Sequence, residues 1–369
     1  MTPPHLSSTK ILLVHATAGA GHTKAAEAVF HGLEKRAPKT AVIIDALDHT
    51  SPFFRVAYSK GYEFMVGKMP TFWAGFFALT DQRWFLPVFR FIRRIYNGMN
   101  AGPLVKFVRE GNFDVVVSVH FFSAEVLGWM RRTGQLKAKV VVIVTDYDVH
   151  HIWVVDGVDE YCVASEFTRS RLVKMGVDEN KIFVTGIPVD EKFTVVRDKK
   201  EVRGRLGLDA QKFTILLSTS SFGFGPIEEL AELLHEEQMI IICGNNKELF
   251  GRLTQKANPL HKICKFVNNM EELMAASDVM ITKPGGLSIT EALANNLPLI
   301  FFSAIPGQEA GNVRVLAANG IGWSDLALAD IASTIRGLSC SPAAFHEARE
   351  KTKALARPHS VQDIIKRLI

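Results

Sequence analysis

The chain has few cysteines and no long apolar run, and both features limit what kind of protein it is. Its four cysteines are scattered over 369 residues without the spacing of metal ligands. We expect them to be reduced and mostly buried, as in a cytoplasmic protein. The apolar runs, such as Val140–Val144, have the length of strands, and none approaches the roughly 18 residues of a membrane-spanning helix. The polar first residues show no signal peptide, so a cytoplasmic protein is predicted.

The first glycine-rich loop lacks the fingerprints of the common nucleotide sites. The apolar run Lys10–Ala16 is followed by Thr17–Ala26, TAGAGHTKAA, and then a helical pattern, as in the first unit of a doubly wound sheet. The loop has neither the full dinucleotide motif nor the Gly-Lys-Ser/Thr of a Walker loop. Gly19 and Gly21 would let a substrate approach the backbone closely. His22 is then a candidate general base, or alternatively a capping or solvated histidine.

Two polar loops in the second half predict a site for a nucleotide-sugar diphosphate. Ile281–Ala292, ITKPGGLSITEA, has the pattern of a strand end, a glycine turn and a helix start, and Pro306–Asn312, PGQEAGN, follows one strand later. Free N–H groups and the helix dipole at such a start favour a phosphate. The alternative is an ordinary strand–turn–helix unit. The candidate ligand-binding residues are Ser288 and Thr290 for phosphate, Glu291 for ribose, and Gln308 and Glu309 for the sugar.

The positive charge is concentrated in one aromatic segment. Between Phe53 and Asn100 there are seven Lys/Arg against two Asp/Glu, a surplus equal to the +5 of the whole chain, and 14 of the 35 aromatic residues. This composition is typical of a surface that lies on an anionic bilayer, and it does not suggest nucleic acid. The alternative is a core of aromatics with a solvated rim of arginines. The predicted membrane residues are Trp73, Phe76, Trp84, Arg90, Arg93 and Arg94.

Strand and helix patterns alternate along the whole chain, which predicts an α/β protein of parallel sheets. We expect two doubly wound domains facing a cleft, residues 1–190 and 191–350, and a C-terminal helix, 351–369, packing back on the first domain. A helical insertion, Phe53–Arg109, separates the second and third strands. The predicted strands are Ile11–His15, Val42–Ile44, Val115–Val119, Val140–Val144, Glu160–Ala164, Ile182–Thr185, Phe213–Ser218, Met239–Cys243, Ile263–Phe266, Val279–Thr282 and Leu299–Phe302.

Five motifs, in this order, resemble those of a known family. VTDYDVHHIWV, Val144–Val154, and GIPVD, Gly186–Asp190, join the three loops already described. Together they resemble the diacylglycerol glycosyltransferases, which include the processive glucosyltransferases of bacteria and the monogalactosyldiacylglycerol synthases of plastids. The bacterial enzymes look most similar, through TDY..H..W and KPGG, and the resemblance covers nearly the whole chain. A more distant relative with the same fold is the N-acetylglucosaminyltransferase of peptidoglycan synthesis.

The resemblance implies a GT-B fold and an inverting, metal-independent transfer from UDP-glucose or UDP-galactose to diacylglycerol, with no cofactor. The first domain would bind the lipid at the inner face of the cell membrane, and the second would hold the nucleotide. By position, His22 is the candidate base and Asp146 its candidate partner, which would set the tautomer or stabilise the charged ring. The diphosphate would be held at Gly285, Gly286, Ser288 and Thr290, the ribose at Glu291, and the sugar at Gln308 and Glu309.

Several positions depart from the family pattern or keep two interpretations. In STSSFGFG, Ser220 and Ser221 stand where relatives often have glycine, and they would bind phosphate unless the loop stands further off. His120 in SVHFF is either a second cleft histidine or a strand-end residue with a backbone partner. Lys283 would add a positive charge or point to solvent. Asp146 and Asp148 formally fit an Asp-X-Asp metal motif, but the resemblance argues against a metal there.

Two other functions share parts of this pattern. A UDP-N-acetylglucosamine epimerase has the same fold, but it would need further charged residues in the cleft and no membrane surface. A nucleotide-sugar sensor or cell-division regulator would keep the site and bind a partner. The intact His22 and Glu291 favour catalysis.

Overall fold

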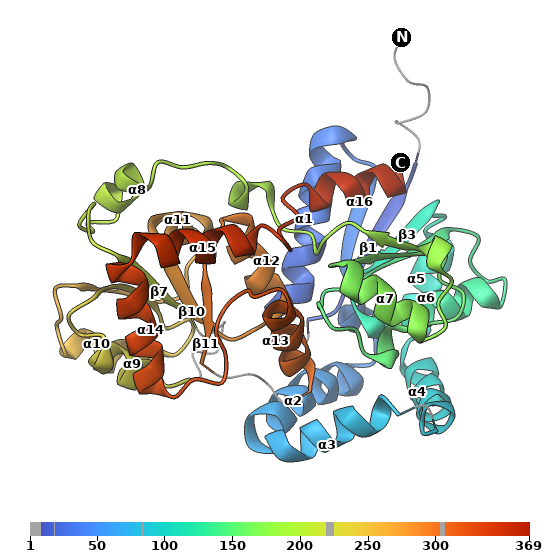
Figure 1. Ribbon diagram of the computed structural model, residues 1–369. Coiled ribbons are helices and arrows are strands. Elements are labelled where there is room, and N and C mark those ends of the chain that lie inside the picture. Colours follow the sequence, from blue (N-terminus) through green and yellow to red (C-terminus); the bar gives the residue numbers. More distant parts are fainter. Residues whose placement is uncertain (1–8, 18, 83, 219–224, 303–306) are drawn as a thin grey trace, which may run out of the picture. The chain divides into compact units, whose positions relative to one another are not determined.

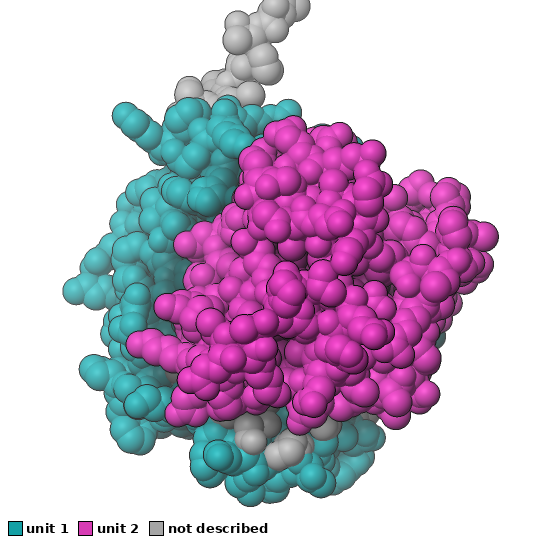
Figure 2. Space-filling model, turned by 90° about the vertical axis from the view of Figure 1, so that its left-hand side faces the viewer, with its two compact units in different colours: residues 1–191, 305–312, 357–369 teal, residues 192–304, 313–356 magenta. Residues whose placement is uncertain are grey.

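The protein divides into two compact units. The computed structural model describes residues 9–17, 19–82, 84–218, 225–302 and 307–369. Unit 1 comprises residues 1–191, 305–312 and 357–369, and unit 2 comprises residues 192–304 and 313–356 (Figure 2). Each unit contains one parallel sheet, of six strands in unit 1 and five in unit 2, so all eleven predicted strands are present.

Unit 1 is built on a sheet with the strand order β2-β1-β3-β4-β5-β6. Its strands are short runs of valine and isoleucine, as expected of parallel strands that are covered on both faces. The chain passes from β1 to β2 on one side and then crosses to β3 on the other, so the switch point of the sheet lies between β1 and β3. The strands are β1 (Ile11–His15), β2 (Ala41–Asp45), β3 (Val115–Ser118), β4 (Lys139–Ile143), β5 (Glu160–Val163) and β6 (Ile182–Val184).

Alternate residues of these strands form two cores, one on each face of the sheet. Leu12 and Val14 of β1 belong to a core completed by the helices after β2 and β3, whereas Ile11 and Leu13 pack with the first and last helices of the chain. The period of two along each strand produces this separation. The covering helices are α1 (Ala20–Arg36), α5 (Gly102–Glu110), α6 (Phe121–Arg132), α7 (Glu166–Lys174) and α16 (Ser360–Leu368).

The helical insertion predicted between the second and third strands is confirmed. It consists of α2 (Pro52–Lys68), α3 (Pro70–Thr80), α4 (Leu86–Asn100) and α5, each with a proline in its first turn. α2 packs on α3, and α4 packs on α5 and α6. Figure 1 shows α2, α3 and α4 together at one end of unit 1. Phe54, which is fully buried, anchors α2 in the core, with its ring tilted against the Phe122 ring at 5.3 Å between centroids.

The last helix of the chain belongs to unit 1, where it lies beside α1 (Figure 1). Gly32 of α1 makes this close packing possible, because a Cβ at that position would lie only 2.5 Å from Cγ1 of Val361. Arg367 at the end of α16 pairs with Glu160 of β5 at 2.7 Å. A sequence-distant helix thereby closes one face of the first sheet.

Unit 2 has the strand order β11-β10-β7-β8-β9, with its switch point between β7 and β10. The edge strand β9 begins and ends two residues before the predicted range, because its ladder with β8 aligns His261 with Met239. The strands are β7 (Thr214–Ser218), β8 (Gln238–Ile242), β9 (His261–Cys264), β10 (Val279–Thr282) and β11 (Leu299–Phe301). The helices are α8 (Lys199–Arg205), α9 (Ile227–Leu233), α10 (Lys247–Gln255), α11 (Met270–Ala276), α12 (Gly286–Ala294), α14 (Leu328–Cys340) and α15 (Pro342–Thr352). A further helix, α13 (Gln308–Ala318), begins in unit 1 and continues into unit 2, because the division falls after Asn312.

Candidate active site

The first candidate site lies at the switch point of the unit 1 sheet. The glycine-rich loop after β1 ends at Gly19, which is the N-cap of α1 and has φ of 130°, a conformation that other residues rarely adopt. Gly21 and His22 follow in the first turn of α1. The carboxyl ends of β3 and β4 bring Val119 and Thr145 to the same place. Three loops that are far apart in sequence therefore surround one histidine.

The partners of His22 determine which ring nitrogen carries the proton. Its Nδ1 lies 2.8 Å from the carbonyl oxygen of Val119 and 3.0 Å from Oγ1 of Thr145. A carbonyl oxygen only accepts hydrogen bonds, so Nδ1 of the neutral ring must be the protonated nitrogen. Nε2 then carries the lone pair, as a general base requires.

Burial keeps this ring neutral. Desolvation lowers the pKa of His22 to about 4, the hydrogen bond to Val119 opposes that shift, and the charge of His15 adds to it. His15 ends β1, and its Nδ1 lies 3.3 Å from the hydroxyl of Thr23. The imidazole of His22 is therefore unprotonated throughout the neutral pH range.

His120 turns out to have a backbone partner and to lie beside His22 as well. It is the N-cap of α6, and its Nδ1 accepts a hydrogen bond from the N–H of Phe122 at 3.1 Å. Its ring meets that of His22 edge-on, with 4.6 Å between centroids. Desolvation holds the pKa of His120 well below its usual value. The structure shows the backbone partner of one interpretation, and the same ring lies against His22, so the two interpretations do not exclude one another.

The tautomer of His22 is fixed at its Nδ1, where the acceptor is the carbonyl of Val119. Asp146, the predicted partner of His22, directly follows Thr145 and is itself buried. Its role toward His22 stays a prediction, whereas the same motif brings the Thr145 hydroxyl to the ring.

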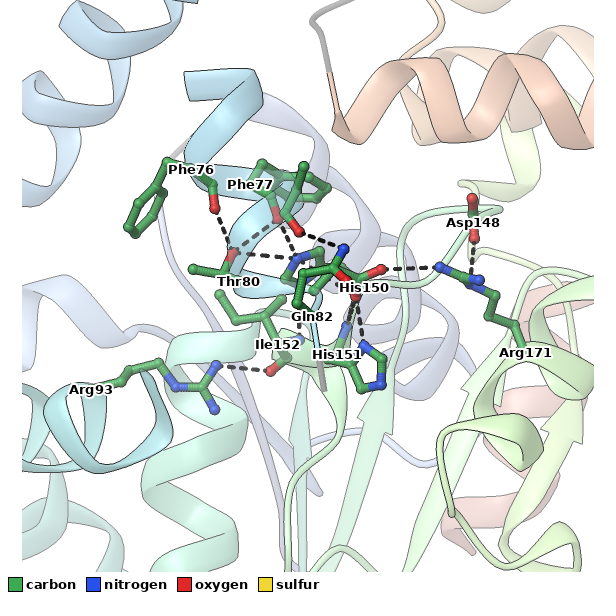
Figure 3. A network of polar contacts seen from close by, with 12 residues as sticks. Phe76, Phe77, Thr80, Gln82, Arg93, Asp148, His150, His151, Ile152 and Arg171 are labelled. Carbon is green, nitrogen blue, oxygen red and sulfur yellow. Dashed lines mark hydrogen bonds and ion pairs between the residues drawn. The ribbon is translucent and has the colours of Figure 1, made fainter. Parts of the chain in front are cut away.

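The rest of the TDYDVHH motif fastens the loop after β4 to α3, as Figure 3 shows. His150 packs on Phe77 with ring centroids 4.2 Å apart and donates from Nε2 to the carbonyl of Phe77 at 3.0 Å. Asp81, the C-cap of α3, accepts from the N–H and the ring of His151 and from Arg171. Burial acts to raise the pKa of Asp81, but the hydrogen bonds from His151 and the charges of His150 and His151 outweigh it and hold the pKa below its usual value.

The PGQEAGN loop packs on the same motif. A Cβ at Gly307, where φ is 94°, would lie 2.7 Å from the Phe77 ring, and one at Gly311 would lie 2.8 Å from Cβ of Asp148. Asn312 accepts from the N–H of Tyr147 at 2.8 Å. The small residues and the asparagine of this loop therefore have packing roles that the motif alone did not reveal. The predicted sugar ligands Gln308 and Glu309 occupy the first turn of α13.

The second candidate site lies at the switch point of the unit 2 sheet. α12 begins directly after β10, with Gly285 as its N-cap and Gly286 as its first residue. The N-cap Gly285 has no side chain that could cap this helix start, and the first turn carries no acid. Ser288 lies in that turn. Thr290 lies a turn deeper, where its buried hydroxyl donates to the carbonyl of Gly286 at 2.8 Å.

The remaining predicted ligands of this site have the following places. Glu291 is half-buried on α12, and Lys283 is half-buried in the loop after β10. Ser220 and Ser221 lie outside the described residues, in the loop that follows β7. Within the described ranges no three His, Cys, Asp or Glu side chains are grouped as metal ligands would be.

The predicted membrane segment carries most of the exposed apolar side chains. Fourteen of the 21 exposed large hydrophobic residues of the described chain lie between Phe53 and Met99. Trp84 is 73% exposed and Phe76 is 37% exposed, whereas Trp73 is half-buried. No helix of the described residues is both long and apolar enough to span a bilayer.

Helix α4 is oriented with its apolar face outward, which corrects the prediction for Arg93. Arg93 is not a surface residue: its side chain is 12% exposed and pairs with Glu125 of α6 at 2.6 Å. It also donates to the carbonyl of Ile152 (Figure 3). Arg94 is exposed and Arg90 half-buried. The face that points away from the protein consists of Val88, Phe91, Ile92, Ile95 and Met99, which are spaced along one side of the helix.

The ion pair between Arg93 and Glu125 was not predicted from the sequence, because the two residues are 32 positions apart. Glu125 is the only acid in the apolar stretch of α6, FFSAEVLGWM, and a lone acid in such a stretch indicates that a buried partner exists. Asn97 supplies a further bond to Glu125, at 2.6 Å.

The chain matches the models of two known families. A family model described as monogalactosyldiacylglycerol (MGDG) synthase matches residues 22–189, and one described as the glycosyltransferase family 28 C-terminal domain matches residues 225–367. The processive diacylglycerol beta-glucosyltransferase of Bacillus pumilus (strain SAFR-032) is 26% identical over 374 residues, which cover 98% of this chain and 95% of that protein.

Solved structures share the fold. Acinetobacter baumannii MurG superposes with a TM-score of 0.60 at 14% identity, and Anabaena HepE in complex with UDP superposes with a TM-score of 0.56 at 13% identity; each comparison covers 98% of this chain and 99% of the other. The predicted GT-B fold is confirmed, and the protein is a glycosyltransferase. The two matched models follow one another along most of the chain, and they support its resemblance to the diacylglycerol glycosyltransferases.

Proposed function

We propose that the protein transfers glucose or galactose from a UDP-sugar to diacylglycerol at the inner face of the cell membrane, with inversion at the anomeric carbon. The observation that carries the proposal is the contact between Nδ1 of His22 and the carbonyl of Val119, which leaves Nε2 as a base. The match to the MGDG synthase model and the name of the Bacillus pumilus relative support the lipid acceptor. The complex of Anabaena HepE with UDP supports the uridine donor.

In this reaction His22 removes a proton that an alcohol does not release at neutral pH. The hydroxyl oxygen of diacylglycerol attacks C1 of the sugar, the bond from C1 to the phosphate oxygen breaks, and UDP leaves with the electron pair. The proton passes to Nε2 of His22. The Val119 carbonyl, which accepts from Nδ1–H, then stabilises the imidazolium. A base of this kind contributes about 10²–10⁴-fold to the rate.

The donor would be held by the helix start of α12. Its free N–H groups at Gly286 and beyond, with the hydroxyl of Ser288, favour the charge that develops on the leaving diphosphate. Glu291 would accept from the ribose hydroxyls, and Gln308 and Glu309 from the sugar. Because the helix supplies the positive potential, the proposal includes no metal and no cofactor.

The acceptor would be reached from the membrane through the apolar face of α4. Apolar side chains on one side of a helix, with basic residues beside them, are typical of helices that lie in the headgroup region of a bilayer. The loop after β4, which holds Thr145 at His22, is bonded to both α3 and α4. On this proposal, membrane contact and the catalytic base belong to the same unit of the protein.

The first test replaces the base. His22→Ala should reduce transfer by about 10²–10⁴-fold while UDP binding stays nearly unchanged, since the base acts on the acceptor. His31→Ala is the matched control, because His31 is an exposed histidine on the same helix. Turnover and calorimetric UDP affinity are measured together. Turnover of His22→Ala within tenfold of wild type would remove His22 from the mechanism, and sugar interconversion without acceptor would indicate an epimerase instead.

The pH profile tests the same residue independently. The lowered pKa of His22, about 4, means that kcat/KM should stay level from pH 7 down to about pH 5 and fall only as pH approaches 4. An unperturbed histidine would place the acid limb near 6.5. A limb at 6.5 would contradict the assignment of this buried ring as the base.

The donor site is tested at Glu291. Its replacement by alanine removes a charged acceptor from two ribose hydroxyls, and such a bond is worth about 1.5–3 kcal/mol. UDP should then bind roughly tenfold to a hundredfold more weakly. An unchanged UDP affinity would place the nucleotide elsewhere.

A further inference from the structure

Arg171 of α7 lies between two carboxylates of unit 1 (Figure 3). Its Nη2 is 3.1 Å from Oδ2 of Asp81, the C-cap of α3, and its Nε is 3.1 Å from Oδ1 of Asp148 in the TDYDVHH motif. Asp148 is the more buried partner, with 8% of its side chain exposed against 22% for Asp81. One guanidinium group therefore joins the end of α3 to the loop after β4, and a lysine, with its single nitrogen, lacks that fork.

The helix that carries Arg171 is a fixed support for the motif. α7 packs on β5 and β6, so its place does not depend on the loop. Thr168, three residues before Arg171 and on the same side of the helix, donates from its hydroxyl to the carbonyl of Tyr147 at 2.7 Å. Two neighbouring motif residues, Tyr147 and Asp148, are therefore held by one face of α7.

The same two motif residues also contact the PGQEAGN loop. The Asn312 side chain accepts from the N–H of Tyr147 at 2.8 Å and from that of Asp148 at 3.4 Å. Gly311 lies so close to Asp148 that a Cβ on it would be 2.8 Å from Cβ of Asp148. These contacts agree with the division of the chain, in which residues 305–312 belong to unit 1. The first turn of α13 therefore rests on the motif that Arg171 holds.

We propose that Arg171 is a positioning residue for the donor sugar, because it holds Asp148 in the place against which the first turn of α13 packs. That turn carries Gln308 and Glu309, the residues assigned to the sugar, so the inference rests on the proposed function in that one assignment. Arg171 itself contacts neither substrate. Ribose and diphosphate are assigned to α12, so the affinity for UDP without its sugar should not depend on Arg171.

The charge of Arg171 matters because Asp148 is buried. A buried carboxylate is destabilised by lost hydration and stabilised by a nearby positive charge. Without the guanidinium, Asp148 would gain hydration by turning toward solvent, and the surface that Gly311 packs against would move. Closely packed interiors transmit such shifts, since they contain few voids. The first turn of α13 would then lose its fixed position against the motif, while the helix start of α12 would be unaffected.

The test is calorimetry of UDP and of the UDP-sugar, without acceptor, on the wild type and on Arg171→Gln. UDP-glucose and UDP-galactose are both titrated, and the one that the wild type binds more tightly is used. Arg171→Gln should weaken binding of the UDP-sugar by roughly threefold to tenfold, since a hydrogen bond to the sugar is lost, and leave UDP within about twofold. Lower stability alone would not separate the two ligands.

Two further variants on α7 serve as controls. Arg169→Gln removes the same charge from the same helix, but the partners of Arg169 are Glu166 and Glu179, outside the motif, so both ligands should bind as to the wild type. Arg171→Lys keeps the charge on a single nitrogen and should fall between the wild type and Arg171→Gln. The melting temperature of each variant shows whether it is folded.

Gly311→Ala tests the same contact from the side of α13. The added Cβ would displace Asp148 and should cause the same selective loss of UDP-sugar affinity. Combined with Arg171→Gln it should add little, because both changes act on one contact. Fully additive losses would show that Arg171 and Gly311 act independently, which contradicts the proposal.

The outcomes separate this inference from the proposed function. Unchanged UDP-sugar affinity in Arg171→Gln, an equal loss for UDP and the UDP-sugar, or an equal effect of Arg169→Gln would overturn the inference. Glu309→Ala tests the assignment on which it rests. If Glu309→Ala weakens UDP-sugar binding and Arg171→Gln does not, the positioning role alone fails. An unchanged affinity in Glu309→Ala removes the sugar assignment itself, and the inference with it.

Discussion

Helices α4 and α16 are both amphipathic, both belong to unit 1, and they are oriented in opposite ways. α16 turns Val361, Ile364 and Ile365 to the core and its basic residues outward. α4 turns Arg93 and Asn97 inward and leaves its apolar side exposed. The comparison teaches that an amphipathic pattern defines two faces and does not state which one meets the protein. In α4 the polar face can pack inward because Glu125 forms an ion pair with Arg93 and accepts a hydrogen bond from Asn97. The apolar face of the helix remains exposed.

The largest effect should come from breaking the inward polar contact of α4. Arg93→Gln leaves Glu125 without its ion-pair partner in a buried position, which costs about 3–5 kcal/mol of unfolding free energy. Arg94→Gln, at the exposed neighbouring position, should change it by no more than about 0.5 kcal/mol. Denaturant unfolding measures both. If the two variants are equally stable, α4 does not dock through Arg93.

The apolar faces of the two helices should also differ in what they contribute to stability. Ile364→Ala on α16 empties a fully buried position and should cost about 2–5 kcal/mol. Ile95→Ala on α4, where the side chain is 49% exposed, should change stability by no more than about 0.5 kcal/mol. Similar losses for both isoleucines would show that α4 packs against the protein in solution.

The smallest difference in stability is expected between alanine substitutions at two glycines, one on α1 and one on α4. Gly32→Ala on α1 would place a Cβ 2.5 Å from Val361 and should cost about 1–3 kcal/mol through overpacking. Gly98→Ala on α4 meets no atom within 4 Å and should stabilise the helix by about 0.5–1 kcal/mol. Thermal unfolding of the two variants measures the difference, and a destabilising Gly98→Ala would mean that this side of α4 is covered.

The sequence was sufficient for the sheets and insufficient for the orientation of surface helices. Runs such as Ile11–His15 and Val279–Thr282 were predicted at their observed bounds, because buried parallel strands are continuous apolar runs between turns. The insertion was predicted as helical, but Arg93 was assigned to its surface. The pattern of α4 is the same for either orientation, and only the distant Glu125 decides between them.

For the candidate site, the sequence likewise indicated local features and missed the contacts between distant segments. His22 and the start of α12 follow from local strand–loop–helix patterns. The Val119 carbonyl did not, since a backbone acceptor leaves no mark on residue type. Thr145 was adjacent to the residue selected, Asp146, and its contact with His22 follows only from the register of β4 against β3 and of β3 against β1.

The central claim is that the outward face of α4 is the membrane surface of a glycosyltransferase. The direct measurement is glycolipid formation by Phe91→Ser/Ile95→Ser, on diacylglycerol in vesicles and on diacylglycerol dispersed in detergent. Burial of each such side chain is worth about 1.5–3 kcal/mol, so vesicle activity should fall roughly a hundredfold or more, while activity in detergent stays within a few-fold of wild type. An equal change on both substrates, or none on vesicles, would contradict the claim.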